Sequence, residues 1–290
     1  MTKPEKQHKF ILMERFNPLN DYLFLKIMGE KGDEVQLLAF LNAVLADSRQ
    51  KPIKLVKILE NRVITPEILG NKTSILDIHA LTDENDKAEI EVQLKDLHNM
   101  EKRTLLYWAR EYTQAISAGV DYSELPRVIT INIVNFDNIK LNRFHTIFHI
   151  REDIEKDYVL TDVLEIHFLN MVKFRKTENK DIKNNVLCRC LTYFDEKTPE
   201  NELMEVIKMD AAIQKANERL NFVTQDKDFL RNYHMRQMEM SDWTTGINTA
   251  IEKNKLEMAK NALTNGFSAD VIHGITGLSI DDIMSLQNDK

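Results

Sequence analysis

The feature that most constrains the fold is the segment 128–134, which reads VITINIV. Its apolar residues occupy both odd and even positions, whereas a strand with one buried face alternates apolar and polar residues. A short, β-branched and almost continuously apolar segment is typical of a strand that is covered on both faces. We therefore expect a sheet with this segment at its centre and helices packed on it.

The flanking segments predict helices and further strands by their periodicity. Apolar residues at helical spacing predict a helix at 33–47 and another at 101–118, the second with Leu105, Trp108 and Tyr112 on one side. Strand patterns occur at 54–60, 74–81, 88–94, 144–150 and 163–169. The order predicts an α/β core with a mixed sheet.

We expect three parts along the chain: an N-terminal arm at 1–15, the core at 16–178 and a helical C-terminal region at 179–290. The last part has helical period and is rich in Lys, Glu, Asn and Met. Within it, residues 251–286 predict two or three short amphipathic helices. Three glycines are expected to interrupt them: Gly266, Gly274 and Gly277.

Composition excludes several classes of protein. The chain has 39 basic and 46 acidic residues, a net charge of −7, so it is no polycation and any nucleic-acid contact would be made by local patches. The two cysteines, Cys188 and Cys190, cannot supply a disulfide framework or a zinc ribbon. No apolar segment reaches the roughly 18–20 residues that cross a bilayer, and no signal-peptide core is present. We expect a cytoplasmic protein with no membrane partner.

One polar face of the predicted hairpin is the strongest candidate for chemistry. The apolar residues of 74–81 and of 88–94 fall at even positions, so even positions must pair with even ones. The register in which paired residue numbers sum to 168 satisfies this and places Asp77 opposite Glu91, with 83–85 as the loop. Directly opposed side chains have Cβ atoms roughly 4.5–5.5 Å apart. The same face would carry His79, Glu89, Gln93 and Lys95.

Two carboxylates at this separation favour a divalent cation between them, because they otherwise repel each other and raise each other's pKa. Mg²⁺ accepts one or two carboxylates and keeps several waters, one of which can become the nucleophile in phosphodiester hydrolysis. The backbone carbonyl of Val92 could serve as a further ligand. The alternative interpretation is an ordinary half-exposed hairpin with one apolar and one charged face.

The order of these motifs resembles a known family. Asp77 followed by Glu91-Val92-Gln93 on the next strand resembles the active-site signature of the PD-(D/E)xK nuclease superfamily, whose core is helix, three strands, helix and strand. More narrowly, the chain is similar to the recombination-promoting nuclease and transposase-like family. The similar stretches lie at 20–26, 75–78, 89–93, 107–122, 125–129 and 266–279. The resemblance implies an α/β, restriction-endonuclease-like core followed by a helical C-terminal region.

The resemblance also implies a metal-dependent DNA endonuclease linked to recombination or mobile elements. Asp77 and Glu91 would be ligands of Mg²⁺, with Mn²⁺ as the alternative ion. Gln93 stands where the superfamily usually has Lys, the residue that orients or activates the attacking water, and Gln can only orient it. Lys95 is the second choice for that position. Asp21 matches an acidic position of the family, or instead caps a helix that begins at Tyr22.

DNA contacts would come from local polar and basic groups, because the chain is acidic overall. The expected set is Lys95, Lys102, Arg103, Gln114 and Arg127, with Arg110, Lys140 and Arg143 as further candidates. A solvated charged face would explain the same residues. The helical region could serve DNA handling or formation of a homodimer. The rival hypothesis is a catalytically silent DNA-binding or assembly protein on the same fold.

Overall fold

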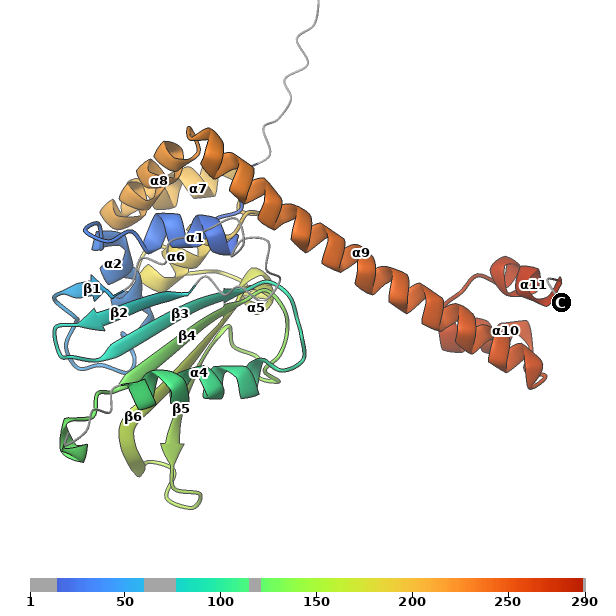
Figure 1. Ribbon diagram of the computed structural model, residues 1–290, viewed down its shortest axis with the longest axis horizontal. Helices are drawn as coiled ribbons and strands as arrows, with labels where there is room; N and C mark the ends of the chain where they lie inside the picture. Colours follow the sequence, from blue (N-terminus) through green and yellow to red (C-terminus); the bar gives the residue numbers. More distant parts are fainter. Residues whose placement is uncertain (1–14, 60–76, 115–120, 289–290) are drawn as a thin grey trace, which may run out of the picture. The chain divides into compact units, whose positions relative to one another are not determined.

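The computed structural model of the protein describes residues 15–59, 77–114 and 121–288. Its strands are β1 (Val56–Ile58), β2 (Ile78–Thr82), β3 (Lys87–Gln93), β4 (Val128–Val134), β5 (His145–Arg151) and β6 (Val159–Asn170). In the described residues they form one mixed sheet with the order β1-β2-β3-β4-β6-β5 (Figure 1). Strands β3, β4 and β6 are parallel, and the other pairs are antiparallel. The predicted α/β core with a mixed sheet is confirmed.

Strand β4 is the segment whose sequence predicted a central strand, and all of its residues are buried. It pairs with β3 on one side and with β6 on the other. Ile129, Ile131 and Ile133 share one face of the sheet, and Thr130 and Asn132 share the other because side chains alternate along a strand. Helices pack on both faces, which explains why apolar residues occur at both parities.

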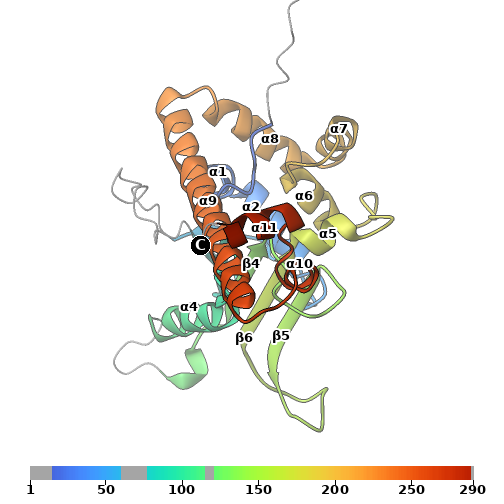
Figure 2. The same ribbon diagram turned by 90° about the vertical axis from the view of Figure 1, so that its right-hand side faces the viewer.

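Helices α1 (Asp21–Met28), α2 (Val35–Val44), α5 (Met171–Lys176) and α6 (Val186–Phe194) cover the isoleucine face of β4 (Figures 1 and 2). Phe24, Phe40 and Phe194 pack edge to face among these helices, with ring centroids 5.4 to 6.5 Å apart. Such aromatic contacts add to the stabilisation that burial of the rings provides. The larger hydrophobic layer of the protein lies on this side of the sheet.

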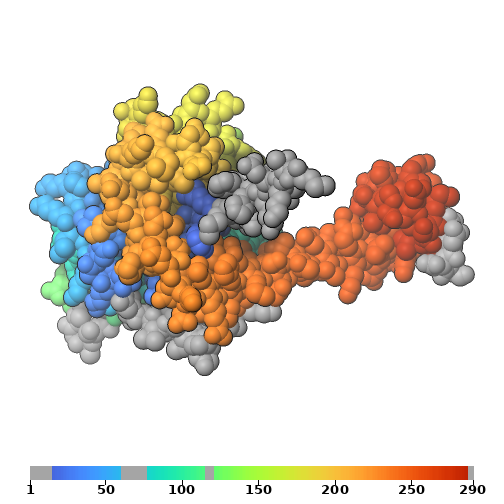
Figure 3. Space-filling view, turned by 90° about the horizontal axis from the view of Figure 1, so that it is seen from above, coloured from blue at the N-terminus to red at the C-terminus, as the bar shows by residue number. Residues whose placement is uncertain are grey.

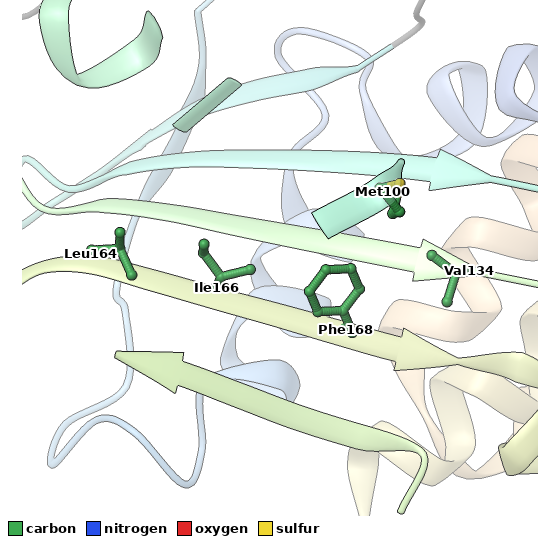
Figure 4. Close-up of a cluster of buried hydrophobic side chains, with 5 residues drawn as sticks. All are labelled: Met100, Val134, Leu164, Ile166 and Phe168. Carbon is green, nitrogen blue, oxygen red and sulfur yellow. The ribbon is translucent and has the colours of Figure 1, made fainter. Parts of the chain in front are cut away.

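Helix α4 (Met100–Gln114) covers the opposite face and confirms the predicted helix at 101–118 as far as residue 114. Residues 115–118 and the rest of the loop to 120 lie outside the described residues. The apolar part of this interface consists of Met100, Val134, Leu164, Ile166 and Phe168 (Figure 4).

The side of α4 that faces the sheet differs from the predicted one. Trp108 packs against the apolar cluster, as expected, and its ring stacks on Tyr112. Leu105, however, is 49% exposed, whereas Met100 and Thr104 are buried. The buried stripe therefore runs through positions 100, 104 and 108, so it includes Trp108 but not Leu105 of the predicted side.

The helices after the sheet begin with α7 (Glu200–Met209) and α8 (Ala211–Val223), followed by α9 (Lys227–Thr264). Helix α8 packs against α1 and α2 (Figure 3). The described residues divide into two compact units between His234 and Met235. The expected start of a helical region at residue 179 is therefore not a boundary between compact units. The division into an arm, a nuclease core and a helical region stays a prediction.

The second unit contains the remainder of α9 with α10 (Ala269–Thr276) and α11 (Ile280–Asn288). Its small core is formed by Ala259, Ile272, Leu278 and Ile283. The expected breaks at Gly266 and Gly277 are confirmed, and both glycines have positive φ, +81° and +70°. The expected break at Gly274 is wrong, because this residue lies inside α10.

The structure also corrects the start of the predicted tail helices. Residues 251–264 continue α9, so no new helix begins near Ile251.

A 3₁₀ turn, η1 (Tyr122–Glu124), precedes β4 in the first unit. Among the described residues, none of the helices is long and apolar enough to cross a membrane.

Candidate metal centre

The β2–β3 hairpin has the register that its apolar pattern predicted. Ile78 pairs with Ile90, His79 with Glu89 and Ala80 with Ala88. Asp77 directly precedes β2, and one further step of the same register leads to Glu91. The apolar residues of both strands face α1, so the polar ones face α4.

Three side chains on this polar face are close enough to share one cation. Asp77, His79 and Glu89 each offer a ligand atom, and these atoms all lie within 4.8 Å of one another. Together these three residues form the acidic cluster. Glu89 is 4% exposed, and the other two are half-buried. Two carboxylates and an imidazole suit a divalent metal such as Mn²⁺, and the carboxylates suit Mg²⁺. The donor set therefore fits the cation that the sequence predicted, with His79 and Glu89 as additional donors.

His79 is oriented for such a role by helix α4. Its Nδ1 lies 3.4 Å from Oε1 of Glu111, and its Nε2 is buried with no hydrogen-bond partner among the described residues. Metal-binding histidines commonly donate one ring nitrogen to a carboxylate and bind the ion with the other. Burial lowers the pKa of His79, but the Glu111 hydrogen bond and the charges of Glu89, Glu111 and Asp77 outweigh it, so the pKa is raised.

Glu91 is engaged differently from the prediction that it shares a cation with Asp77. Its side chain is 2% exposed and forms an ion pair with Arg103 of α4. The same Nη2 of Arg103 donates to Oε1 of Gln93 at 2.7 Å. The amide nitrogen of Gln93 donates to the backbone carbonyl of Lys95 at 2.8 Å. Arg103 therefore balances the charge of Glu91 and fixes the orientation of the Gln93 amide.

Asp21 is the first residue of α1, where its Oδ1 accepts a hydrogen bond from the backbone N–H of Tyr22 at 2.8 Å. The helix cap is Asn20, whose side chain accepts from the N–H of Leu23 at 3.1 Å, so the alternative of Asp21 as the cap is wrong. Val92 lies on β3 with its side chain buried. The catalytic role of Asp21 and the carbonyl-ligand role of Val92 stay predictions.

The residues expected to contact DNA are not gathered in one place. Lys102 and Gln114 are exposed on α4, and Lys95 is half-buried just after β3. Arg127 forms an ion pair with Glu165, whose side chain is fully buried on the sheet face opposite α4. Arg103 of the expected set contacts both Glu91 and Gln93 through its side chain, and Lys95 contacts Gln93 through its backbone carbonyl.

Glu89 was not predicted as a metal ligand from the sequence, and Glu111 was not considered. Glu89 shares the parity of Glu91 and lies opposite His79, so the register alone could have assigned it to the cluster. Residues 103, 107 and 111 lie on one side of α4 because they are spaced by four. This stripe, of Arg103, Tyr107 and Glu111, is the polar counterpart of the apolar stripe on the same helix.

Comparison with known protein families gives one match. The model of a family described as PD-(D/E)XK nuclease family transposase matches residues 18–250, which include the whole sheet, α4 and the acidic cluster. A comparison with curated proteins finds no match, and a comparison with solved structures finds none either.

Proposed function

The chain belongs to the PD-(D/E)XK nuclease family transposases, and from this membership and its acidic cluster we propose that it is a metal-dependent DNA endonuclease. Its nuclease-like function is linked to mobile elements through the family. The observation that carries the finer proposal is the convergence of Asp77, His79 and Glu89 within 4.8 Å on the face where the family signature lies.

Asp77, His79 and Glu89 would hold Mg²⁺ or Mn²⁺, and Glu91 would join them as the predicted family ligand. A bound cation lowers the pKa of a ligated water and offsets negative charge on a phosphate. Gln93 would orient the attacking water, because its amide oxygen and nitrogen each retain capacity for a second hydrogen bond. The exposed Lys102 and Gln114 would contact the DNA backbone, as would Lys95.

Three further expectations belong to this proposal. We infer that DNA is the main partner, that the protein acts in the cytoplasm, and that the helical region after residue 178 handles DNA or forms a homodimer. The family assignment supports the first of these, because nucleases of this superfamily act on DNA.

The test is plasmid nicking and cleavage in Mg²⁺ or Mn²⁺, with wild type compared with Asp77→Asn and Glu91→Gln. Wild type is expected to cut, and both variants are expected to lose cutting while their circular dichroism stays unchanged. Glu101→Gln is the matched control, because Glu101 is exposed on α4 and its loss changes the charge equally. Equal cutting by wild type and both site variants would refute the assigned site.

A catalytically silent DNA-binding or assembly protein is the second candidate function. The ion pair between Arg103 and Glu91 favours it, because this pair balances the Glu91 carboxylate without a metal. The two candidates differ in a direct way: a silent protein would leave plasmid intact in every cation while it retards DNA in a gel.

A further inference from the structure

The contact between Arg103 and Glu91 lies beside the candidate metal centre. Glu91 is 1% exposed, and one oxygen of its carboxylate meets the Arg103 guanidinium. Its other oxygen, Oε2, is buried and has no hydrogen-bond partner among the described residues. A buried carboxylate with an unused oxygen has not reached its full coordination.

The guanidinium is also only partly used. Its Nη2 serves both Glu91 and Gln93, while its Nε is buried without a partner in the described part of the chain. The strongest arginine–carboxylate pairs are bidentate, with two nitrogens on two oxygens. Arg103 thus supplies charge to Glu91 without the geometry of a pair optimised for stability alone.

The carboxylates around Glu91 create a need for positive charge beside it. Asp77, Glu89 and Glu111 all act electrostatically on His79, and Glu91 follows Glu89 by two residues on the same face of β3. Carboxylates gathered under a helix destabilise the fold unless positive charge neutralises them. Arg103 provides such a charge at Glu91.

We propose that Arg103 is a positioning residue that substitutes for the metal at Glu91, and that a divalent cation must displace its guanidinium before Glu91 becomes a ligand. This inference rests on the proposed function, since it requires a cation site beside Asp77. The ring of Tyr107 on α4, whose centroid lies 5.6 Å from the Arg103 Cζ atom, offers the guanidinium an aromatic face when it leaves Glu91. Arg103 and the cation then compete for one carboxylate, which makes their binding mutually unfavourable.

The test is calorimetric titration of the full chain with Mn²⁺. Arg103→Met is expected to bind Mn²⁺ about tenfold more tightly than wild type, a coupling of ordinary size. Lys208→Met is the control, because it removes an exposed positive charge on α7 that has no part in the candidate site, so it should leave the affinity unchanged. In a Glu91→Gln background, Arg103→Met should no longer change the affinity, because the contested carboxylate is gone.

Arg103→Met can fail to fold without metal, because it leaves the Glu91 charge buried and unbalanced. The wild-type protein then provides the second measurement. The ¹⁵N resonance of the Arg103 Nη2, the nitrogen that contacts Glu91 and Gln93, is assigned with Arg103→Lys and is expected to shift and merge with that of Nη1 when Mg²⁺ is added to the full chain. A guanidinium that stays paired with Glu91 would keep its two Nη resonances separate.

Two results would overturn the inference and separate it from the proposed function. If wild type and Arg103→Met bind Mn²⁺ equally, or if the Arg103 resonance does not move while Asp77-dependent binding occurs, the displacement is wrong and the metal site stands. If wild type binds neither Mn²⁺ nor Mg²⁺, the proposed function fails, and this inference fails with it.

Discussion

The hydroxyl of Thr104 donates a hydrogen bond to Oδ1 of Asn132, with 3.0 Å between the two oxygens, and both residues are buried. Thr104 lies on α4 and Asn132 on the central strand β4, so this bond joins the helix to the middle of the sheet. The Asn132 amide nitrogen donates to the backbone carbonyl of His167 at 3.0 Å, which completes the link to β6. Asn132 pairs with Glu91 of β3 on one side and with Phe168 of β6 on the other, so the bond lies between the acidic cluster and the apolar one.

Thr104→Val tests this link. The substitution keeps the shape of the side chain but leaves Oδ1 of Asn132 without its donor, which is expected to lower the free energy of unfolding by about 1–3 kcal/mol. Urea unfolding measures the change. Thr113→Val is the control, because Thr113 is exposed on the same helix and its hydroxyl bonds only to a local carbonyl, that of Arg110.

The fold could be predicted from the sequence in segments whose apolar periodicity and length are compatible with only one kind of element. The segment 128–134 predicted a strand buried on both faces, and the even-numbered apolar residues of β2 and β3 fixed their register. Gly274 was misassigned because a glycine inside a helix lowers helix stability without ending it, whereas Gly277 ends α10 with a left-handed conformation. Residues 227–264 were predicted as part of a helical region but not as one continuous helix, because this segment lacks a strong amphipathic pattern that would mark its bounds.

Only the part of the candidate site that lies on the β2–β3 hairpin could be predicted from the sequence. Register placed Asp77 on the same face as Glu91, and the pairing of His79 with Glu89 followed from the same rule. The partner of Glu91 could not be predicted, because Arg103 comes from a helix whose rotation over the sheet depends on tertiary packing. Once Met100 and Thr104 are buried, the position of Arg103 follows from helical geometry.

Glu89→Gln tests the contribution of Glu89 to cation binding. The variant keeps the size of the side chain but removes one of the negatively charged donors, so Mn²⁺ affinity is expected to fall about tenfold or more. Calorimetry measures the affinity, and Glu101→Gln, an exposed charge change on α4, should not alter it. Unchanged affinity in Glu89→Gln would exclude Glu89 as a ligand and leave Asp77 and Glu91 as the predicted pair.

Gln93→Lys tests whether the residue that is usual in the superfamily can work in this chain. Lysine offers no acceptor for Arg103, which donates to the Gln93 oxygen at 2.7 Å, and it adds a second positive charge beside the guanidinium. We expect a loss of about 1–3 kcal/mol in the free energy of unfolding and no gain in cleavage.

Gln93→Met separates the effect of the lost acceptor from the effect of the added charge, because it removes the acceptor and adds no charge. Gln93→Lys is expected to be the less stable of the two variants in urea unfolding. Faster plasmid cleavage by Gln93→Lys, with wild-type stability, would show that Arg103 does not constrain this position.

A second polar network lies on the sheet face opposite α4. His167 Nε2 is 2.7 Å from Oε1 of Glu165, and its Nδ1 is 2.9 Å from Nε2 of His145. Burial lowers the pKa of His167 to about 3, and nearby Arg127 adds to this effect. Burial and the charges of His167 and Arg143 lower the pKa of His145 to about 4. Glu165 also forms an ion pair with Arg127, and the pKa of His167 stays lowered beside it.

These lowered pKa values predict that acid destabilises the fold. The unfolded chain binds protons at its histidines below a pKa of about 6.5, whereas His167 and His145 stay neutral in the fold until about pH 3 and about pH 4. Between these limits the unfolded state binds more protons, so the free energy of unfolding falls as the pH falls, by up to about 1.4 kcal/mol per pH unit for each histidine. Urea unfolding between pH 7 and pH 4.5 measures this slope.

His145→Gln isolates the contribution of one histidine. Glutamine can still donate toward Nδ1 of His167 but does not titrate, so the slope should become shallower by up to about 1.4 kcal/mol per pH unit. His98→Asn provides the control, because the His98 side chain is 89% exposed and asparagine tolerates the positive φ of 53° at this position. An equal slope in wild type and His145→Gln would mean that His145 is protonated in the folded state as readily as in the unfolded chain. In that case Nε2 of His145 cannot be held neutral by the buried contact with His167.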